Sequence, residues 1–490
     1  MNIQDAKKYI KDTIRAYLKK DEFGDYRISV EKQRPIFLIG APGIGKTAIM
    51  SQIANELQIA LVSYSMTHHT RQSALGLPFI KEKNYKGDVY SVSEYTMSEI
   101  IASVYDVMEE SGVKEGILFL DEINCVSETL YPSMLQFLQY KVFGKHRVPE
   151  GWIIVTAGNP PEFNKAVREF DVVTLDRLKV IDVDADYPAW KKYALEKGIH
   201  GSILGFLESN KDCFYVIETT AGGKSYVTAR GWEDLSDMIF LYEEDNGRVS
   251  EELIFQYLRN ERVTKEFAAY YDLYNKYKRK VDIEAVFEKS LSEKVRETLP
   301  LAPIDEKLAL IGLLCDTLRE ELKAVMDEYE ILSDLKGVVA AIAGSGEDCM
   351  KALEEAIQKL DGEMRARLRA GSLLHAGKTR YKKKISLLRK FDELSSDEND
   401  IKSLYNAEIA AFRGKVKNAQ VRSDNLLDEI SAIFGSESNE MLLLISELTL
   451  DNYCASFFAS FGLEGYEKYS EILKVADRSD ALRKEIEELM

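Results

Sequence analysis

The segment from Gly40 to Thr47 constrains the fold more than any other part of the sequence. It reads Gly-Ala-Pro-Gly-Ile-Gly-Lys-Thr, and it lies between the apolar run Pro35–Ile39 and a stretch with helical periodicity. Glycines let backbone N–H groups turn towards one centre without a Cβ clash, and a following helix adds its positive N-terminal dipole. The pattern therefore predicts a strand, a phosphate-binding loop and a helix.

The side chains that end this loop indicate a nucleoside triphosphate. Lys46 can reach the β- and γ-phosphates, and Thr47 can offer its hydroxyl to Mg²⁺. An ordinary glycine turn is the alternative, but the flanking strand and helix disfavour it. The candidate nucleotide-binding residues are Gly40, Ala41, Pro42, Gly43, Ile44, Gly45, Lys46 and Thr47.

A second motif pairs an apolar strand with two acids. Ile117–Leu120 is followed directly by Asp121 and Glu122. In open α/β sheets, ligands bind at the carboxyl ends of the strands. We expect Asp121 to hold Mg²⁺ through its water shell and Glu122 to polarise the attacking water as a general base. Such a strand end is often only a turn, but its pairing with Lys46 favours the catalytic interpretation.

Residues 1 to about 180 alternate between strand and helix patterns, which is typical of a parallel sheet covered on both faces. Besides the strands already named, 60–66 and 153–157 are apolar enough to be buried. Two β-hairpins are predicted, one around residues 77–92 and one around Gly144-Lys145. From about 185 onwards the pattern is helical, and the second half of the chain carries no catalytic signature.

The net charge of −17 argues against a chain whose main task is to bind nucleic acid. Affinity for a nucleic-acid backbone comes from cations that neutralise phosphates, and an acidic surface repels them. A local basic groove stays open as an alternative. The five cysteines match neither a disulfide framework nor the spacing of zinc ligands.

The N-terminal residues form an amphipathic pattern, with Ile3, Ala6, Ile10 and Ile14 on one side. This pattern lacks the unbroken apolar stretch of a signal peptide. The apolar runs elsewhere are too short to cross a bilayer. We therefore expect a cytoplasmic protein with reduced thiols and no membrane partner.

Taken together, the motifs Gly40–Thr47 and Ile117–Glu122 resemble those of the AAA+ ATPases, and the two hairpins resemble the MoxR-type branch. The similarity covers residues from about 30 to 240. It implies an α/β P-loop NTPase core with a parallel sheet, a helical lid and a long all-α C-terminal extension. The implied domains are an N-terminal helix (1–25), the nucleotide-binding domain (26–183), the lid (184–280) and the extension (281–490).

The resemblance also implies roles for three further residues. Asn159, after the strand Ile153–Ala157, matches the polar residue that positions the attacking water, although it could be only a turn residue. Arg177 matches an arginine that enters the neighbouring subunit's site, and a salt bridge is its structural alternative. Arg230 matches a lid arginine that contacts nucleotide. The family normally has a proline just before this arginine, and Ala229 takes that place here, so a surface role is also possible for Arg230.

The function implied by the resemblance is Mg-dependent ATP hydrolysis in a homo-oligomeric, hexameric ring that remodels a partner protein. That partner could carry a von Willebrand factor A domain. Two alternatives stay open: an ATP-switched scaffold without sustained turnover, and a nucleic-acid motor. From their position alone, Ser65 or Thr67 could contact Glu122 and restrain it until the ring assembles.

Overall fold

The computed structural model describes residues 1–68, 72, 74, 76–163, 167–220, 223–280, 282–345, 348–395 and 397–471. These residues form two compact units. The first consists of Met1–Asp186 together with Glu355–Ser386. The second consists of Tyr187–Glu354 and the described residues from Leu387 onwards.

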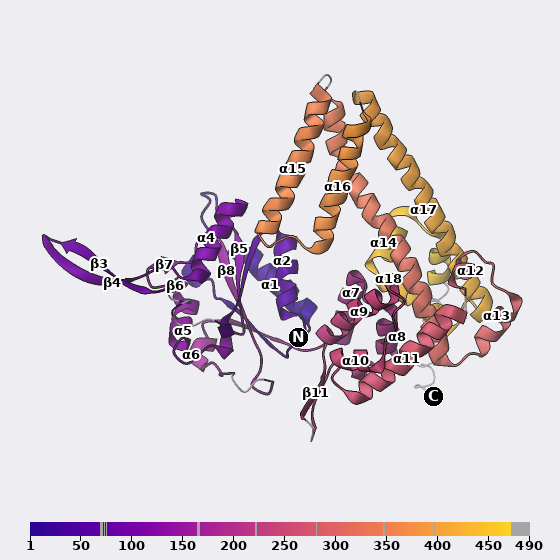
Figure 1. Ribbon diagram of the computed structural model, residues 1–490, viewed down its shortest axis with the longest axis horizontal. Helices are drawn as coiled ribbons and strands as arrows, with labels where there is room; N and C mark the ends of the chain where they lie inside the picture. The colour runs from indigo at the N-terminus through magenta and orange to yellow at the C-terminus, as the bar shows by residue number, and fades with distance from the viewer. Residues whose placement is uncertain are drawn as a thin grey trace, which may run out of the picture. The chain divides into compact units, whose positions relative to one another are not determined.

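The first unit is built on a parallel sheet with the strand order β2-β5-β8-β1-β9 (Figure 1). Its three central strands are apolar and almost wholly buried, because helices cover both faces of a sheet of this type. The strands are β1 (Ile36–Gly40), β2 (Ala60–Ser65), β5 (Gly116–Asp121), β8 (Trp152–Gly158) and β9 (Lys179–Val183). The accompanying helices are α1 (Ile3–Tyr17), α2 (Lys46–Leu57), α4 (Glu99–Ser111), α5 (Tyr131–Tyr140) and α6 (Val172–Leu175).

The predicted strands β1, β2, β5 and β8 are confirmed, and so is the amphipathic helix α1. The predicted apolar side of α1 is buried. Strand β9 was not predicted. It pairs with β1 at the edge of the sheet, and Lys179, Val180 and Asp182 are not fully buried, so its sequence lacks the apolar run of the central strands.

Both predicted hairpins are present in the first unit. Strands β3 (Pro78–Tyr85) and β4 (Asp88–Tyr95) form a long ribbon that extends away from the sheet (Figure 1). The short strands β6 (Val142–Phe143) and β7 (His146–Arg147) form the second hairpin. Lys145, in the turn of this second hairpin, forms an ion pair with Glu94 of β4, so the two hairpins are joined.

A segment from the second half of the chain completes the edge of the sheet in the first unit. It is the turn between α15 (Cys349–Arg369) and α16 (His375–Leu394). The carbonyl oxygen of Ala370 in this turn accepts a hydrogen bond from the backbone N–H of Leu61 in β2, at 2.8 Å. Ala370 is fully buried in the apolar core of the first unit.

The second unit is mainly helical, as predicted, with one two-stranded hairpin that was not predicted. The hairpin consists of β10 (Val216–Thr220) and β11 (Gly223–Val227). Its main helices are α7 (Tyr187–Lys197), α8 (Gly201–Ser209), α9 (Ala229–Glu244), α10 (Glu251–Tyr257), α11 (Glu261–Lys280), α12 (Ile283–Phe287), α13 (Glu293–Thr298), α14 (Ile304–Ala343), α17 (Glu398–Phe434), α18 (Asn439–Leu450) and α19 (Asn452–Phe461). Buried side chains of α12, α14, α17, α18 and α19 share one apolar core. Within the described ranges, no helix is both long and apolar enough to span a bilayer.

Candidate active site

The loop from Ala41 to Gly45 joins β1 to α2, and its glycines serve two different purposes. Gly43 and Gly45 have φ angles of 74° and 95°, in the left-handed region that glycine adopts without strain. Gly40 has no room for a side chain, because a Cβ there would lie 2.5 Å from the carbonyl oxygen of Val183 in β9. The loop can therefore turn its N–H groups inward while β9 packs closely against Gly40, the last residue of β1.

Lys46 is the first residue of α2, and its ammonium group lies inside this loop. The residue is 8% exposed. Its Nζ donates to the carbonyl oxygens of Gly40 and Ala41, at 2.7 and 2.8 Å, and to Oδ1 of Asn159, at 2.9 Å. A phosphate group presents acceptors of the same kind, so this placement suits a lysine that binds phosphate oxygens.

Thr47 and Asp121 connect the loop to the acids at the end of β5. The Thr47 hydroxyl donates to Oδ2 of Asp121 at 2.7 Å. A hydroxyl and a carboxylate are the hard oxygen ligands that Mg²⁺ prefers, and the ion commonly takes its remaining ligands from water and the phosphates of a nucleotide. These two side chains therefore fit the metal-binding role predicted for them.

Glu122 follows Asp121 with a φ of 55°, which turns the chain sharply at the end of the strand. Its Oε2 accepts hydrogen bonds from the hydroxyls of Ser65 and Thr67, each at 3.0 Å. The suggestion that Ser65 or Thr67 contacts Glu122 is thus confirmed for both residues. Burial raises the pKa of the Cys125 thiol, and the negative charges of Glu122 and Asp121 raise it further.

Asn159 follows β8 directly and faces the phosphate-binding loop through its bond to Lys46. Strand β8 lies between β5 and β1, so the ends of these three neighbouring strands bring together Lys46, Glu122 and Asn159. The sequence did not single out Asn124, which is buried beside them and donates from Nδ2 to the carbonyl oxygen of Asn159 at 2.9 Å. Its position two residues after Glu122 was the available signal.

The two arginines belong to different units. Arg177 is exposed between α6 and β9. Across the described residues, its guanidinium makes no ion pair or side-chain hydrogen bond. Arg230 is exposed in the first turn of α9, in the second unit, where the Thr228 hydroxyl caps the helix by accepting from the N–H of Gly231.

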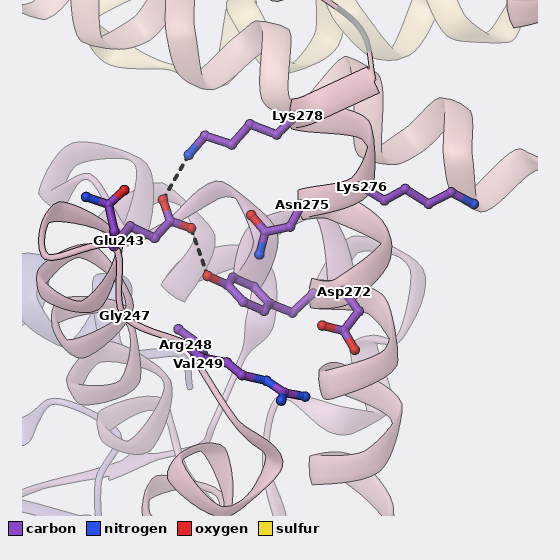
Figure 2. A pocket seen from close by; sticks show the side chains of 10 residues that line it. Glu243, Gly247, Arg248, Val249, Asp272, Asn275, Lys276 and Lys278 are labelled. Carbon is purple, nitrogen blue, oxygen red and sulfur yellow. Dashed lines mark hydrogen bonds and ion pairs between the residues drawn. The ribbon is translucent and has the colours of Figure 1, made fainter.

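The second unit holds a polar hollow of about 880 Å³ between α9 and α11, seen in Figure 2. Its half-buried acid, Glu243, accepts a hydrogen bond from Tyr271 and forms an ion pair with Lys278, both at 2.8 Å. Burial would raise the pKa of Glu243, but hydrogen bonds from His200 and Lys278 outweigh it and lower the pKa to about 2. Glu243 is therefore ionised at neutral pH, and the neighbouring Lys278 balances its negative charge. None of the predicted site residues lines this hollow.

Comparison with known families agrees with the site in the first unit. Residues 36–175 match the model of the ATPase family associated with various cellular activities (AAA). The five-stranded parallel sheet and its flanking helices have the fold of a P-loop AAA+ core. The match supports ATP binding and hydrolysis by this domain. It includes Lys46, both acids and Asn159, and it ends before Arg177. A search among curated proteins found no match.

Proposed function

We propose that this chain binds Mg-ATP in the first unit and hydrolyses it there. The observation that carries the proposal is the hydrogen bond between Thr47 and Asp121, at 2.7 Å. It joins the threonine that follows the glycine-rich loop to the first of the two acids at the end of β5, from segments 74 residues apart in the sequence. An ordinary glycine turn would have no need of this partner.

Each side chain has a defined task in this proposal. The loop N–H groups and Lys46 hold the phosphates, and Thr47 with Asp121 orients the metal ion. When bound, Mg²⁺ offsets charge on the phosphate oxygens. Glu122 orients a water molecule and accepts its proton, and Asn159 fixes the position of Lys46 and of that water.

The proposal extends to assembly and to a partner. We propose a MoxR-like homo-oligomeric ring, hexameric by resemblance, in which Arg177 reaches the site of the next subunit. The exposure of Arg177 supports this role, because its guanidinium is accessible to a neighbouring subunit. Hydrogen bonds from Thr174 and then the charge of Arg177 lower the pKa of Asp171, and no ion pair joins Arg177 to this acid within the described residues. In this proposal the ring remodels a partner protein that bears a von Willebrand factor A domain, and Arg230 contacts nucleotide from the lid.

Phosphate release tests the hydrolytic proposal. Wild type with Mg-ATP should turn over, and Glu122→Gln should bind ATP but release phosphate at a rate lower by about 100-fold or more, as expected for loss of a general base. The matched control is Glu128→Gln, an exposed acid further along the same loop. Equal rates for wild type and Glu122→Gln would overturn the proposed mechanism.

One observation favours the second candidate function, an ATP-switched scaffold. Glu122 is bonded to Ser65 and Thr67, and a carboxylate held in this way is less available to a water molecule. Negligible phosphate release by wild type, together with tight ATP binding, would select the scaffold over the ATPase.

A further inference from the structure

We propose that Asn124 is a positioning residue for Asn159 and that, through Asn159, it sets the rate of the chemical step. This inference rests on the proposed ATPase function and adds a residue to it. Asn124 lies in the short turn Ile123–Cys125 after β5 and is 5% exposed. It would not touch the nucleotide itself, because its amide is directed to the backbone of Asn159.

The first observation is the bond from Asn124 Nδ2 to the carbonyl oxygen of Asn159, at 2.9 Å. This bond holds the peptide group between Asn159 and Pro160 in place. The next residue is Pro160, which has no N–H to donate and which restricts the backbone of Asn159 to extended conformations. The side chain of Asn124 therefore supplies a hydrogen-bond donor at a turn where Pro160 has no backbone N–H to donate.

The second observation is the close fit of Gly158 against the same side chain. A Cβ on Gly158 would lie 2.5 Å from Oδ1 of Asn124, well inside a normal contact distance. Gly158 is the last residue of β8, so the amide of Asn124 packs directly against the strand that carries Asn159. The amide is thus fixed on both sides, by a hydrogen bond and by packing.

The third observation is that these contacts connect Asn124 to both Lys46 and the turn that follows Glu122. Asn159 accepts from Lys46 through Oδ1, at 2.9 Å, and is a side-chain partner that holds the lysine ammonium beside two backbone carbonyl oxygens. Asn124 is two residues after Glu122, and the N–H of Cys125 donates to the Glu122 carbonyl oxygen at 2.9 Å. Asn124 therefore joins the turn that carries the general base to the residue that orients Lys46.

A double-mutant cycle distinguishes positioning from mere structural support. Asn124→Ala should lower kcat by roughly 10- to 100-fold, the cost of a small displacement of a catalytic group, with KM changed less than about threefold. If Asn124 acts through Asn159, the double variant Asn124→Ala/Asn159→Ala should be no slower than Asn159→Ala alone. The proposal would be overturned if the losses in kcat of the two single variants multiplied in the double variant. It would also be overturned if Asn124→Ala left kcat unchanged.

Gly158→Ala provides a second cycle that leaves the chemistry of Asn124 intact. The added methyl should displace the Asn124 amide and lower kcat, but it should cost nothing further when Asn124 is already alanine. The control is Asn425→Ala in the second unit, where Nδ2 also donates to a backbone carbonyl, that of Phe287, at 2.8 Å. This control should lose stability without losing kcat, and a loss of kcat equal to that of Asn124→Ala would contradict a specific role.

Wild type in the same assay separates this inference from the function on which it rests. Absence of wild-type turnover would refute the proposed ATPase function. Hydrogen exchange would then test the positioning role of Asn124, because it does not require turnover. Exchange in the chain around Asn159 should be faster in Asn124→Ala than in wild type or in Asn425→Ala. Equal exchange in all three proteins would overturn the positioning role.

Discussion

At the scale of single residues, the site depends on side chains that hold other side chains. Lys46 is held by Asn159, and Glu122 is held by Ser65 and Thr67. The sequence motifs singled out the members of this group that we propose contact nucleotide. They did not identify Asn124, because an asparagine after two acids has no distinctive pattern until its partner across the sheet is known.

The two hydroxyls on Glu122 lead to a prediction about basal turnover. Combining Ser65→Ala with Thr67→Val should free the carboxylate and raise the ATPase rate of the isolated protein roughly 3- to 10-fold, because a net hydrogen bond of about 1 kcal/mol corresponds to about fivefold. Ser63→Ala, an exposed serine on the same strand, is the matched control. A rate equal to or below that of wild type would show that the hydroxyls help Glu122 rather than restrain it.

The burial of Lys141 leads us to expect that the free energy of unfolding depends on pH. Burial lowers the pKa of Lys141 to about 8, and its Nζ donates to the carbonyl oxygen of Val30 at 2.7 Å. Between about pH 8 and 10.5 the unfolded chain keeps a proton that the folded chain has lost, so this group makes stability rise with pH.

Lys141→Met should remove that contribution. The difference in unfolding free energy between the variant and wild type should shrink by about 2 kcal/mol from pH 7.5 to pH 9.5, measured by urea unfolding. The exposed Lys114→Met should show no such change. A difference that stays constant for Lys141→Met would mean that the buried amine does not change its protonation on folding.

At the scale of secondary-structure elements, predictability follows burial. The central strands could be predicted because a strand covered on both faces must be apolar throughout. Strand β9 could not, because at the sheet edge Val180 and Asp182 stay exposed and the apolar run is interrupted. The hairpin β10–β11 was missed for a similar reason, since its exposed positions, including Lys224 and Tyr226, break the apolar pattern.

The ribbon β3–β4 is expected to depend on one acid at its base. Hydrogen bonds from Lys145 and Lys83 lower the pKa of Glu94 to about 2, so Glu94 is charged at neutral pH and joins the two hairpins. Glu94→Gln should loosen the ribbon and make its cleavage by trypsin at least about twofold faster. Glu82→Gln, in β3, is the control, and equal cleavage of both variants would show that the ion pairs do not anchor the ribbon.

At the scale of the whole molecule, the first unit is discontinuous in sequence. Residues 355–386 join a unit that otherwise ends at Asp186. Helical periodicity predicted that this segment is helical, but it gave no reason to place the turn after α15 against β2. That contact uses a backbone carbonyl, which leaves no trace in the sequence.

Gly371 tests the importance of this turn. It has a φ of 64°, and a Cβ would lie 2.8 Å from the backbone oxygen of Leu61. Gly371→Val should destabilise the first unit by roughly 2–3 kcal/mol, seen as faster hydrogen exchange in β2. Gly414→Ala, inside α17 with open space around it, should be neutral or stabilising. Unchanged exchange in Gly371→Val would mean that the turn does not support the sheet.

The central claim is that the loop from Gly40 to Thr47 binds a magnesium nucleotide, and equilibrium binding of a fluorescent ATP analogue tests it most directly. Wild type should show saturable, magnesium-dependent binding, and Lys46→Ala should bind at least about tenfold more weakly, since it loses charged hydrogen bonds to phosphate. Binding by Lys46→Ala equal to that of wild type, or no saturable binding by wild type, would contradict the account.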